Sequence, residues 1–404
     1  MRSIFLIFFL LMASAATQDV GPKEVWSKTF GGPHGDGFWS LQKTRDGGYI
    51  LTGYTSAQGQ GSDLWLVKVD SDGGLLWDRA YGGSGEDVGY FVKETQDGGY
   101  VVAGSTGSYG MGEERLWILK TDIDGNKQWD CILGGFVSSL GDGGWSVDVT
   151  YDGGYIVTGY TRSFGTGKKD LWLVKTDSEG NLLWDKTFGG LEDDVGMSVV
   201  RAADGGYVVA GRTASFGAGG DDIWLLKVDD DGEEVWNTTF GGVRDEAAFQ
   251  VIEQKDGFAL VGRTESGSES RRIVLIKVDQ EGRELWERNY SGSSGSSLQP
   301  TADGGLLIAG RKDSEDSGRD ALLIKTDSSG WEQWSEEMVA EGDCIATSAI
   351  LDSERYFVIA GISSPSRPCA EDAWLAKFAV VDEGTGRNMS YIEKIFKDRL
   401  RLGV

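Results

Sequence analysis

Short apolar runs, separated by glycine and aspartate, occupy most of the chain. One copy of the pattern has four such runs, at 194–203, 206–213, 222–229 and 234–241, which we call strands A, B, C and D. The runs are rich in Val, Ile, Trp, Tyr and Thr and end at Gly or Asp, which is typical of β-strands. Strand C is apolar at almost every position, so we expect both of its faces to be covered.

The four-strand pattern repeats seven times. A turn with the sequence Asp-Gly-Gly-Tyr lies between strands A and B, and its aspartate recurs at intervals of 47 to 55 residues. A fixed period of this length predicts a repeat array. An open β-solenoid normally has shorter repeats, so the sequence predicts an all-β fold, a seven-bladed β-propeller of four-stranded blades. The markers begin at Asp46, Asp97, Asp152, Asp204, Asp256 and Asp303, with a degenerate seventh copy at Ser353.

The two ends of the array predict how the ring closes. The first element, 25–30, has the pattern of strand D without a preceding A, B or C. The last unit has strands A, B and C at 343–351, 356–363 and 372–379, with no strand D after them. We therefore expect the N-terminal strand to complete the seventh blade and to leave the ring without a long free edge. The propeller would span residues 25–380.

The segments on either side of the propeller have signatures of their own. Arg2, an apolar stretch at 4–12 and the small residues at 13–16 match a signal peptide, and the apolar stretch is too short for a membrane-spanning helix. We therefore predict that residues 1–16 are a leader and that the protein is exported, either secreted or held at the cell surface. Residues 381–404 form a linker and a basic amphipathic tail, which would pack on the ring or dock to a partner or a membrane surface.

Charge and cysteine content narrow the partners. The formal net charge of −25 over 404 residues argues against nucleic acid and a generally anionic membrane surface as partners, and it is compatible with cation binding. Cys131 falls in strand D as an apolar filler. An oxidising exterior would allow Cys344 and Cys369 to form a disulfide. Glycosylation sequons begin at Asn237, Asn289 and Asn388.

Two residue types that recur with the repeat have structural interpretations. The repetition of a tryptophan in strand D predicts packing between blades, at Trp77, Trp129, Trp184 and Trp236. A lysine near the end of strand C recurs in all seven units, which indicates an ion pair at the blade edge or a snorkelling side chain. These lysines are Lys68, Lys120, Lys175, Lys227, Lys277, Lys325 and Lys377.

The loops divide between the two faces of the predicted ring. In propeller topology the A–B and C–D turns share one face, and the B–C and D–A loops share the other. The C–D turn has the sequence Asp-x-Asp-Gly, as at 70–73, but lacks the distal glutamate of a calcium loop. We interpret it as a tight turn whose aspartate binds its own backbone. The B–C and D–A loops vary between units, and several carry an aromatic residue: Tyr109, Phe164 and Phe216.

An acidic residue stands ten positions before the marker in six of the seven units. Because strand A is innermost in a propeller, we expect these acids to ring the mouth of the central channel. Two interpretations stay open: each carboxylate caps backbone amides of a neighbouring blade, or the carboxylates together hold Ca²⁺ or a cationic ligand that offsets their repulsion. The acids are Asp36, Asp87, Asp142, Asp194, Glu246 and Asp343, and the sixth unit has Ser293.

One segment resembles a known repeat. Residues 171–184, with the sequence Leu-Trp-Leu-Val-Lys-Thr-Asp-Ser-Glu-Gly-Asn-Leu-Leu-Trp, resemble the repeat of PQQ-like propellers. The run from the Asp-Gly-Gly-Tyr turn to the Gly-Gly pair after strand D also resembles the delta-60 repeat of exported prokaryotic proteins. The resemblance covers about residues 25–380 and implies a fold rather than an activity. Quinoprotein enzymes of that superfamily use a vicinal disulfide, and no two cysteines are adjacent here, so PQQ-dependent oxidation is not expected.

The sequence favours a non-catalytic exported binding or scaffold module, whose B–C/D–A face presents variable loops to a protein or a glycan. Acids recur, but no base, nucleophile or metal set stands out in a single blade. We therefore predict neither an enzyme nor a cofactor, apart from the Ca²⁺ considered above. The alternatives are a structural component of the cell envelope and a hydrolase or lyase that acts with paired carboxylates at the channel mouth.

Overall fold

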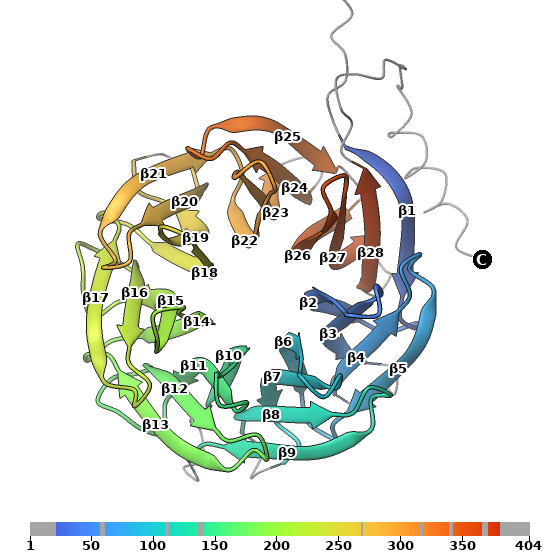
Figure 1. Cartoon of the computed structure of the whole chain (residues 1–404), viewed down its shortest axis with the longest axis horizontal. Helices are drawn as coiled ribbons and strands as arrows, with labels where there is room; N and C mark the ends of the chain where they lie inside the picture. Colours follow the sequence, from blue (N-terminus) through green and yellow to red (C-terminus); the bar gives the residue numbers. More distant parts are fainter. Residues whose placement is uncertain are drawn as a thin grey trace, which may run out of the picture.

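The structure, a computed structural model, describes residues 22–56, 61–109, 113–135, 141–267, 270–314, 318–338, 342–365 and 371–379. Within these residues, 28 strands form seven four-stranded antiparallel sheets, which stand as blades around a central axis (Figure 1). The predicted seven-bladed β-propeller is therefore confirmed.

The strands follow the predicted A-to-D order in every blade. Blades 1 to 6 are β2–β5, β6–β9, β10–β13, β14–β17, β18–β21 and β22–β25, and blade 7 is β26–β28 with β1. Strand A, the innermost, is β2 (Asp36–Lys43), β6 (Asp87–Glu94), β10 (Gly143–Val149), β14 (Asp194–Arg201), β18 (Glu246–Gln254), β22 (Ser294–Pro300) and β26 (Gly342–Ser353). Strand B is β3 (Tyr49–Thr55), β7 (Tyr100–Thr106), β11 (Tyr155–Thr161), β15 (Tyr207–Thr213), β19 (Gly257–Thr264), β23 (Leu306–Ser314) and β27 (Tyr356–Pro365).

The two outer strands of each blade complete the set. Strand C is β4 (Asp63–Val69), β8 (Arg115–Thr121), β12 (Asp170–Thr176), β16 (Asp222–Val228), β20 (Arg272–Val278), β24 (Gly318–Thr326) and β28 (Asp372–Ala379). Strand D is β5 (Leu75–Tyr81), β9 (Lys127–Leu133), β13 (Leu182–Phe188), β17 (Glu234–Phe240), β21 (Glu284–Tyr290), β25 (Glu332–Met338) and, in blade 7, β1 (Lys23–Phe30).

The N-terminal strand closes the ring, as predicted. β1 pairs antiparallel with β28, with Trp26 opposite Lys377 and Phe30 opposite Ala373. Figure 1 shows this strand in blue beside the red β28, which comes from the other end of the repeat array. Trp26 and Phe30 also pack against the apolar cluster that blades 7 and 1 share. The first and last repeats are thereby joined by backbone pairing and by side-chain packing.

The apolar core lies between neighbouring blades. In β12, Trp172, Leu173 and Val174 are all buried. Trp172 and Val174 join a cluster with blade 2, whereas Leu173 joins a cluster with blade 4. A strand that is buried on both faces needs apolar residues at successive positions, so the prediction of a covered strand C is confirmed.

Every innermost strand contains an extra residue at the same place in the repeat. The pairing of strands A and B skips that strand A position in each blade, and in β26 it also skips Asp352. Such a β-bulge leaves a residue outside the ladder and redirects its side chain. The seven residues at this shared position all line the central channel: Trp39, Tyr90, Trp145, Met197, Phe249, Ser296 and Thr347.

A belt of hydrogen bonds joins the innermost strands to one another. Ser198 of β14, for example, accepts a hydrogen bond at 3.2 Å from the amide of Val251 in the next blade. Gln250 takes the same position in β18 and accepts from the amide of Leu298 at 2.6 Å. Bonds of this kind cross six of the seven blade junctions, with Ser40, Ser146, Ser198, Gln250, Ser297 and Ser348 as acceptors.

Candidate functional site

Five of the six predicted acids stand at or just before the start of strand A and lie buried inside the blades. Asp142 is completely buried. Its carboxylate accepts hydrogen bonds from the amide of Gly135 at 3.1 Å and from the hydroxyls of Thr161 and Ser163 at 2.6 and 2.7 Å. Gly135 belongs to the loop that arrives from the preceding blade, whereas Thr161 and Ser163 lie where strand B passes into the B–C loop. The carboxylate therefore ties the D–A loop to the B–C loop.

The same arrangement recurs around the ring. Asp87, Asp194 and Glu246 also bind a loop glycine, the Thr that ends strand B and the Ser two residues later. Asp36 binds the amide of Gly32. The arrangement is that of amide capping, although the amide comes from the loop ahead of the same strand rather than from the body of a neighbouring blade.

The expected position of the acids needs correction. We expected them to ring the channel mouth, but Asp36, Asp87, Asp142, Asp194 and Glu246 are at most 2% exposed, and none of them lines the channel. Among the described residues, no three His, Cys, Asp or Glu side chains come together in a way that could hold a metal ion. Ligand binding by these acids stays a prediction.

Four of these acids have a second carboxylate beside them, at the first residue of strand C in the preceding blade. In one such pair, a Cβ added to Gly241 would lie 2.1 Å from Asp222 Oδ1 and 2.6 Å from Glu246 Oε2, so only glycine fits there. Burial raises the pKa of Asp222, amide hydrogen bonds oppose the shift, and the charge of Glu246 adds to it. The pairs are Asp63–Asp87, Asp170–Asp194, Asp222–Glu246 and Asp372–Asp36.

The sixth predicted acid, Asp343, has a different role. It is partly exposed and accepts hydrogen bonds from Arg319, from the backbone amide to Oδ1 and from Nε to Oδ2, both at 2.9 Å. Hydrogen bonding to Arg319 holds the pKa of Asp343 below its usual range. Arg319 itself lines the channel, so this acid is connected to the channel through its partner.

The central channel contains a cavity of about 520 Å³. Strand A of every blade contributes to its lining, and residues from the ends of strand B and the starts of strand C extend it to the B–C/D–A face. Aromatic side chains from blades 1 to 3 form one wall, where Tyr90 stacks on Trp145 with ring centroids 4.5 Å apart and lies 6.2 Å from Trp39. Three arginines from blades 5 and 6, namely Arg263, Arg311 and Arg319, contribute to the lining on the other side.

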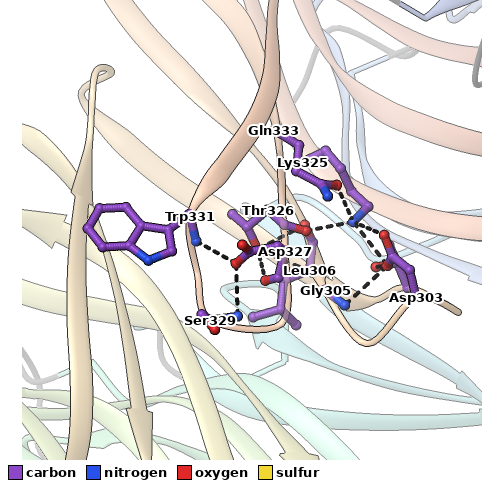
Figure 2. A network of polar contacts seen from close by, with 10 residues as sticks. Asp303, Gly305, Leu306, Lys325, Thr326, Asp327, Ser329, Trp331 and Gln333 are labelled. Carbon is purple, nitrogen blue, oxygen red and sulfur yellow. Dashed lines mark hydrogen bonds and ion pairs between the residues drawn. The ribbon is translucent and has the colours of Figure 1, made fainter. Parts of the chain in front are cut away.

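The A–B/C–D face repeats one network in blades 1 to 6. In blade 6, Lys325 pairs with Asp303 of the A–B turn at 2.8 Å, and Asp327 of the C–D turn accepts hydrogen bonds from the amides of Ser329 and Trp331 (Figure 2). Each of the seven strand C lysines forms such a pair near the A–B turn of its own blade. The predicted lysine ion pairs and backbone-binding aspartates are therefore confirmed, and this face has a structural explanation.

The channel-lining residues were not predicted, although the sequence carries a signal for them. A large apolar side chain stands three residues after the acid in five units, from Trp39 to Phe249, at a position that the interblade core does not need. Strand B contains a glycine in every unit, and the residue after this glycine changes along the chain. It is Tyr, Ser and Tyr in the first three units and Arg in the next three. These breaks in the repeat are where the blades differ in chemistry.

Several predictions concern cysteines and terminal segments. Cys344 is buried in β26 as a free thiol, and burial raises its pKa to about 12. Its proposed partner Cys369, the leader at 1–16, the tail at 381–404 and the sequon at Asn388 lie outside the described residues. Within the described segments, no helix has the length and apolar character that crossing a membrane requires.

Sequence comparison does not place this chain in a family. No protein-family model matches the sequence. The regulatory protein FlaEY of Caulobacter vibrioides is 28% identical over 193 residues, which are 42% of this chain and 19% of that protein. The chain thus matches about a fifth of the length of this relative.

Two solved structures illustrate the structural likeness. The periplasmic gluconolactonase PpgL of Pseudomonas aeruginosa has a TM-score of 0.50 at 14% identity, covering 86% of this chain and all of that one. A protein of unknown function from Dyadobacter fermentans has a TM-score of 0.49 at 10% identity, covering 89% of this chain and all of that one. At 14% identity the likeness to PpgL concerns the fold alone, and the resemblance to PQQ-like repeats stays an expectation.

Proposed function

We propose that this protein is an exported, non-catalytic binding module that holds a glycan or protein ligand at the B–C/D–A face, over the mouth of the channel. The observation that carries the proposal is the change in channel lining from blade to blade. Repetition is sufficient for a propeller fold, so the positions that depart from it are the natural place for function. Loops placed by a rigid scaffold commonly carry binding residues.

The opposite face supports this assignment by contrast. Its lysine–aspartate pairs recur in all seven blades, so their repetition follows from the needs of the fold. On the B–C/D–A face, Tyr109, Phe164 and Phe216 are exposed on three successive blades, and each packs by its edge or at a tilt on the strand C tryptophan of its own blade. Rigid, partly exposed aromatic residues are suited to contact a ligand at low entropic cost.

The state of the acids supports a non-catalytic role. General acid–base catalysis needs a carboxyl group within hydrogen-bonding reach of the substrate. Asp87, Asp142 and Asp194 are fully buried and occupied by loop amides and hydroxyls. A structural role in the cell envelope and an enzymatic role at the channel mouth stay alternatives.

A binding screen with the mature chain, residues 17–404, tests the proposal. The protein would be offered a glycan array and cell-envelope fractions, and the bound glycans would be checked for cleavage products. A double variant, Phe164→Ser with Phe216→Ser, should lose binding. The matched control, Ile123→Ser with Trp331→Ser, removes exposed apolar residues from the opposite face and should keep it.

Each result of the screen has a clear reading. Equal loss in both double variants would contradict the face assignment, and the absence of any bound glycan or envelope component would contradict the binding function. Release of cleaved glycan by the unmodified protein would favour the enzymatic alternative.

A further inference from the structure

The channel joins two walls of unlike chemistry in one cavity. On the wall from blades 1 to 3, Trp39 is 39% exposed and belongs to a row with Tyr90 and Trp145. Arginines contribute from blades 5 and 6, across the ring (Figure 1). Phe249 adds an aromatic side chain from blade 5, but the three arginines of the lining all come from blades 5 and 6. A repeat array has no folding reason to confine its channel arginines to two neighbouring blades, so the asymmetry indicates a ligand with two kinds of surface.

The cationic side is only partly neutralised. Arg319 is paired with Asp343, and Arg311 Nε lies 3.5 Å from Asp313 Oδ1 without forming a hydrogen bond. Arg263 forms no ion pair within the described residues, and its buried Nε has no acceptor there. Burial lowers the pKa of Arg311, and the positive charges of nearby arginines, among them Arg319 and Arg263, lower it further. The negative charge of Asp313 opposes this shift but does not cancel it.

A bound anion would reduce the repulsion between these arginines. Clustered guanidinium groups repel one another. The planar set of donors on a guanidinium group matches the geometry of two kinds of anion, carboxylates and phosphates. The lining has one carboxylate of its own, Glu371, which accepts a hydrogen bond from Tyr54. Three arginines and one glutamate give the lining a formal charge of +2, within a protein whose net charge is −25.

The lining also contains polar side chains that are free to bind hydroxyl groups. Gln42, Gln299 and Ser296 line the cavity, and their side chains form no hydrogen bond with the other described residues. The cavity volume of about 520 Å³ is within the usual range for small-molecule sites, roughly 300–1,000 Å³. It would hold a few rings of a ligand rather than a protein domain.

We propose that the channel binds a carboxylate-bearing saccharide, such as a uronic acid unit at the end of a glycan. The carboxylate lies against Arg263 and Arg311, and the apolar face of the sugar ring lies against Trp39 and Tyr90. Ring hydroxyls bind Gln42 and Gln299. This inference rests on the proposed function and specifies its ligand class, because an acidic sugar combines the three chemistries that the lining offers. A long polyanion is disfavoured by the negative field of the whole protein.

Paired sugars that differ only in charge test the proposal. Titration calorimetry with the mature chain would compare galacturonate, glucuronate and mannuronate mono- and trisaccharides with their methyl esters, which keep the rings and lose the charge. We expect the acids to bind at least about tenfold more tightly than the esters. Raising the salt concentration from about 50 to about 500 mM should weaken binding of the acids, because salt screens the attraction.

A matched pair of arginine variants locates the site. Arg263→Gln should weaken binding of the acids by about tenfold or more and leave the melting temperature of the free protein unchanged, because Arg263 has no ion-pair partner to lose. Arg212 holds the same repeat position in blade 4 but pairs with Asp221 outside the channel, so Arg212→Gln should leave the affinity unchanged. Trp39→Ala, at an exposed ring, should weaken binding of both acids and esters.

The possible results separate this inference from the proposed function. Equal binding of acids and esters, or full affinity in Arg263→Gln, would overturn the carboxylate site. If no uronic acid binds while the array or envelope screen finds another ligand, the inference is wrong and the proposed binding function stands. If neither screen finds a ligand, both are wrong.

Discussion

The aspartates of three A–B turns have a pKa below that of a free carboxylate, so they stay ionised to lower pH. They are Asp46, Asp97 and Asp303. Partial burial alone would raise the pKa of Asp97, but hydrogen bonds from Lys120, Thr95 and the backbone outweigh it and lower the pKa to about 2. The same balance brings the pKa of Asp46 and of Asp303 to about 2. The strand C aspartates behave in the opposite way, since burial and a neighbouring acid raise their pKa.

These opposite shifts predict a stability maximum at mildly acidic pH. The raised aspartates take up protons in the folded state at a higher pH than in the unfolded chain, so stability rises as the pH falls through their raised pKa toward the ordinary value of 3.8. The lowered aspartates stabilise the fold at every pH above their unfolded pKa, and that contribution is lost as the pH falls from about 4 to about 2. Thermal melts at intervals from about pH 7 to about pH 2 would measure both branches.

Two variants test which aspartates cause each part of the pH dependence of stability. Asp222→Asn keeps an oxygen for the amide of Ala218 and removes the charge beside Glu246, so it should flatten the branch between neutral and mildly acidic pH. Asp97→Asn removes an ion pair with Lys120 and should flatten only the acid branch. Identical pH profiles in the wild type and both variants would show that other groups control the pH dependence.

At the scale of the strand, the tryptophan of strand D contacts the next blade and adds to the apolar core between blades. Trp184 of β13 lies at a tilt to Tyr207 of the next blade, with ring centroids 6.4 Å apart, and donates from Nε1 to the carbonyl of Asp230 at 3.1 Å. Gly232 of the C–D turn meets the same ring: its φ is +78°, and an added Cβ would lie 2.9 Å from the indole. The tryptophan and the turn glycine therefore recur together, and the predicted packing between blades is confirmed.

Replacing Trp184 with alanine should destabilise the fold by about 2–3 kcal/mol. This value is below the ~3–5 kcal/mol typical of a fully buried aromatic residue, because the side chain is only partly buried. Chemical denaturation followed by circular dichroism would measure the change. The control is Val235→Ala, an exposed position on a D strand, which should cost less than about 0.5 kcal/mol. Native stability combined with lost glycan binding in Trp184→Ala would instead place the tryptophan in a ligand site.

At the scale of the whole molecule, the sequence predicted the parts that repeat and missed those that do not. Blade number, strand order and closure follow from apolar periodicity, which reports burial between blades. The acids were also found from their period, but the period does not reveal their depth, and Asp142 lies behind the channel wall. Trp39 and Arg263 were missed because a bulge and the curvature of the ring, both non-local features, bring them to one cavity.

Closure of the ring depends on one seam that the chain does not cross, between β1 and β28 inside blade 7. Residues 31–35 link β1 to β2 of blade 1, but β26–β28 are held to β1 and to blade 1 only through noncovalent contacts. These contacts include the β1–β28 ladder and the belt bond from the amide of Leu41 to Ser348 at 3.2 Å. Thr347 adds a hydrogen bond to the carbonyl of Phe38 at 2.7 Å. An opening at this junction would expose β28 as a free strand edge.

Deleting residues 17–31 should therefore lower the melting temperature markedly and make the protein prone to associate through β28. The deletion removes the β1 ladder together with the packing of Trp26 and Phe30. Deleting only residues 17–21 stops short of β1 and should leave the melting temperature unchanged. A synthetic peptide covering 22–32, added in trans, should restore stability to the longer deletion by adding a strand to the exposed edge. An unchanged melting temperature in the 17–31 deletion would mean that the remaining strands hold the ring closed without β1.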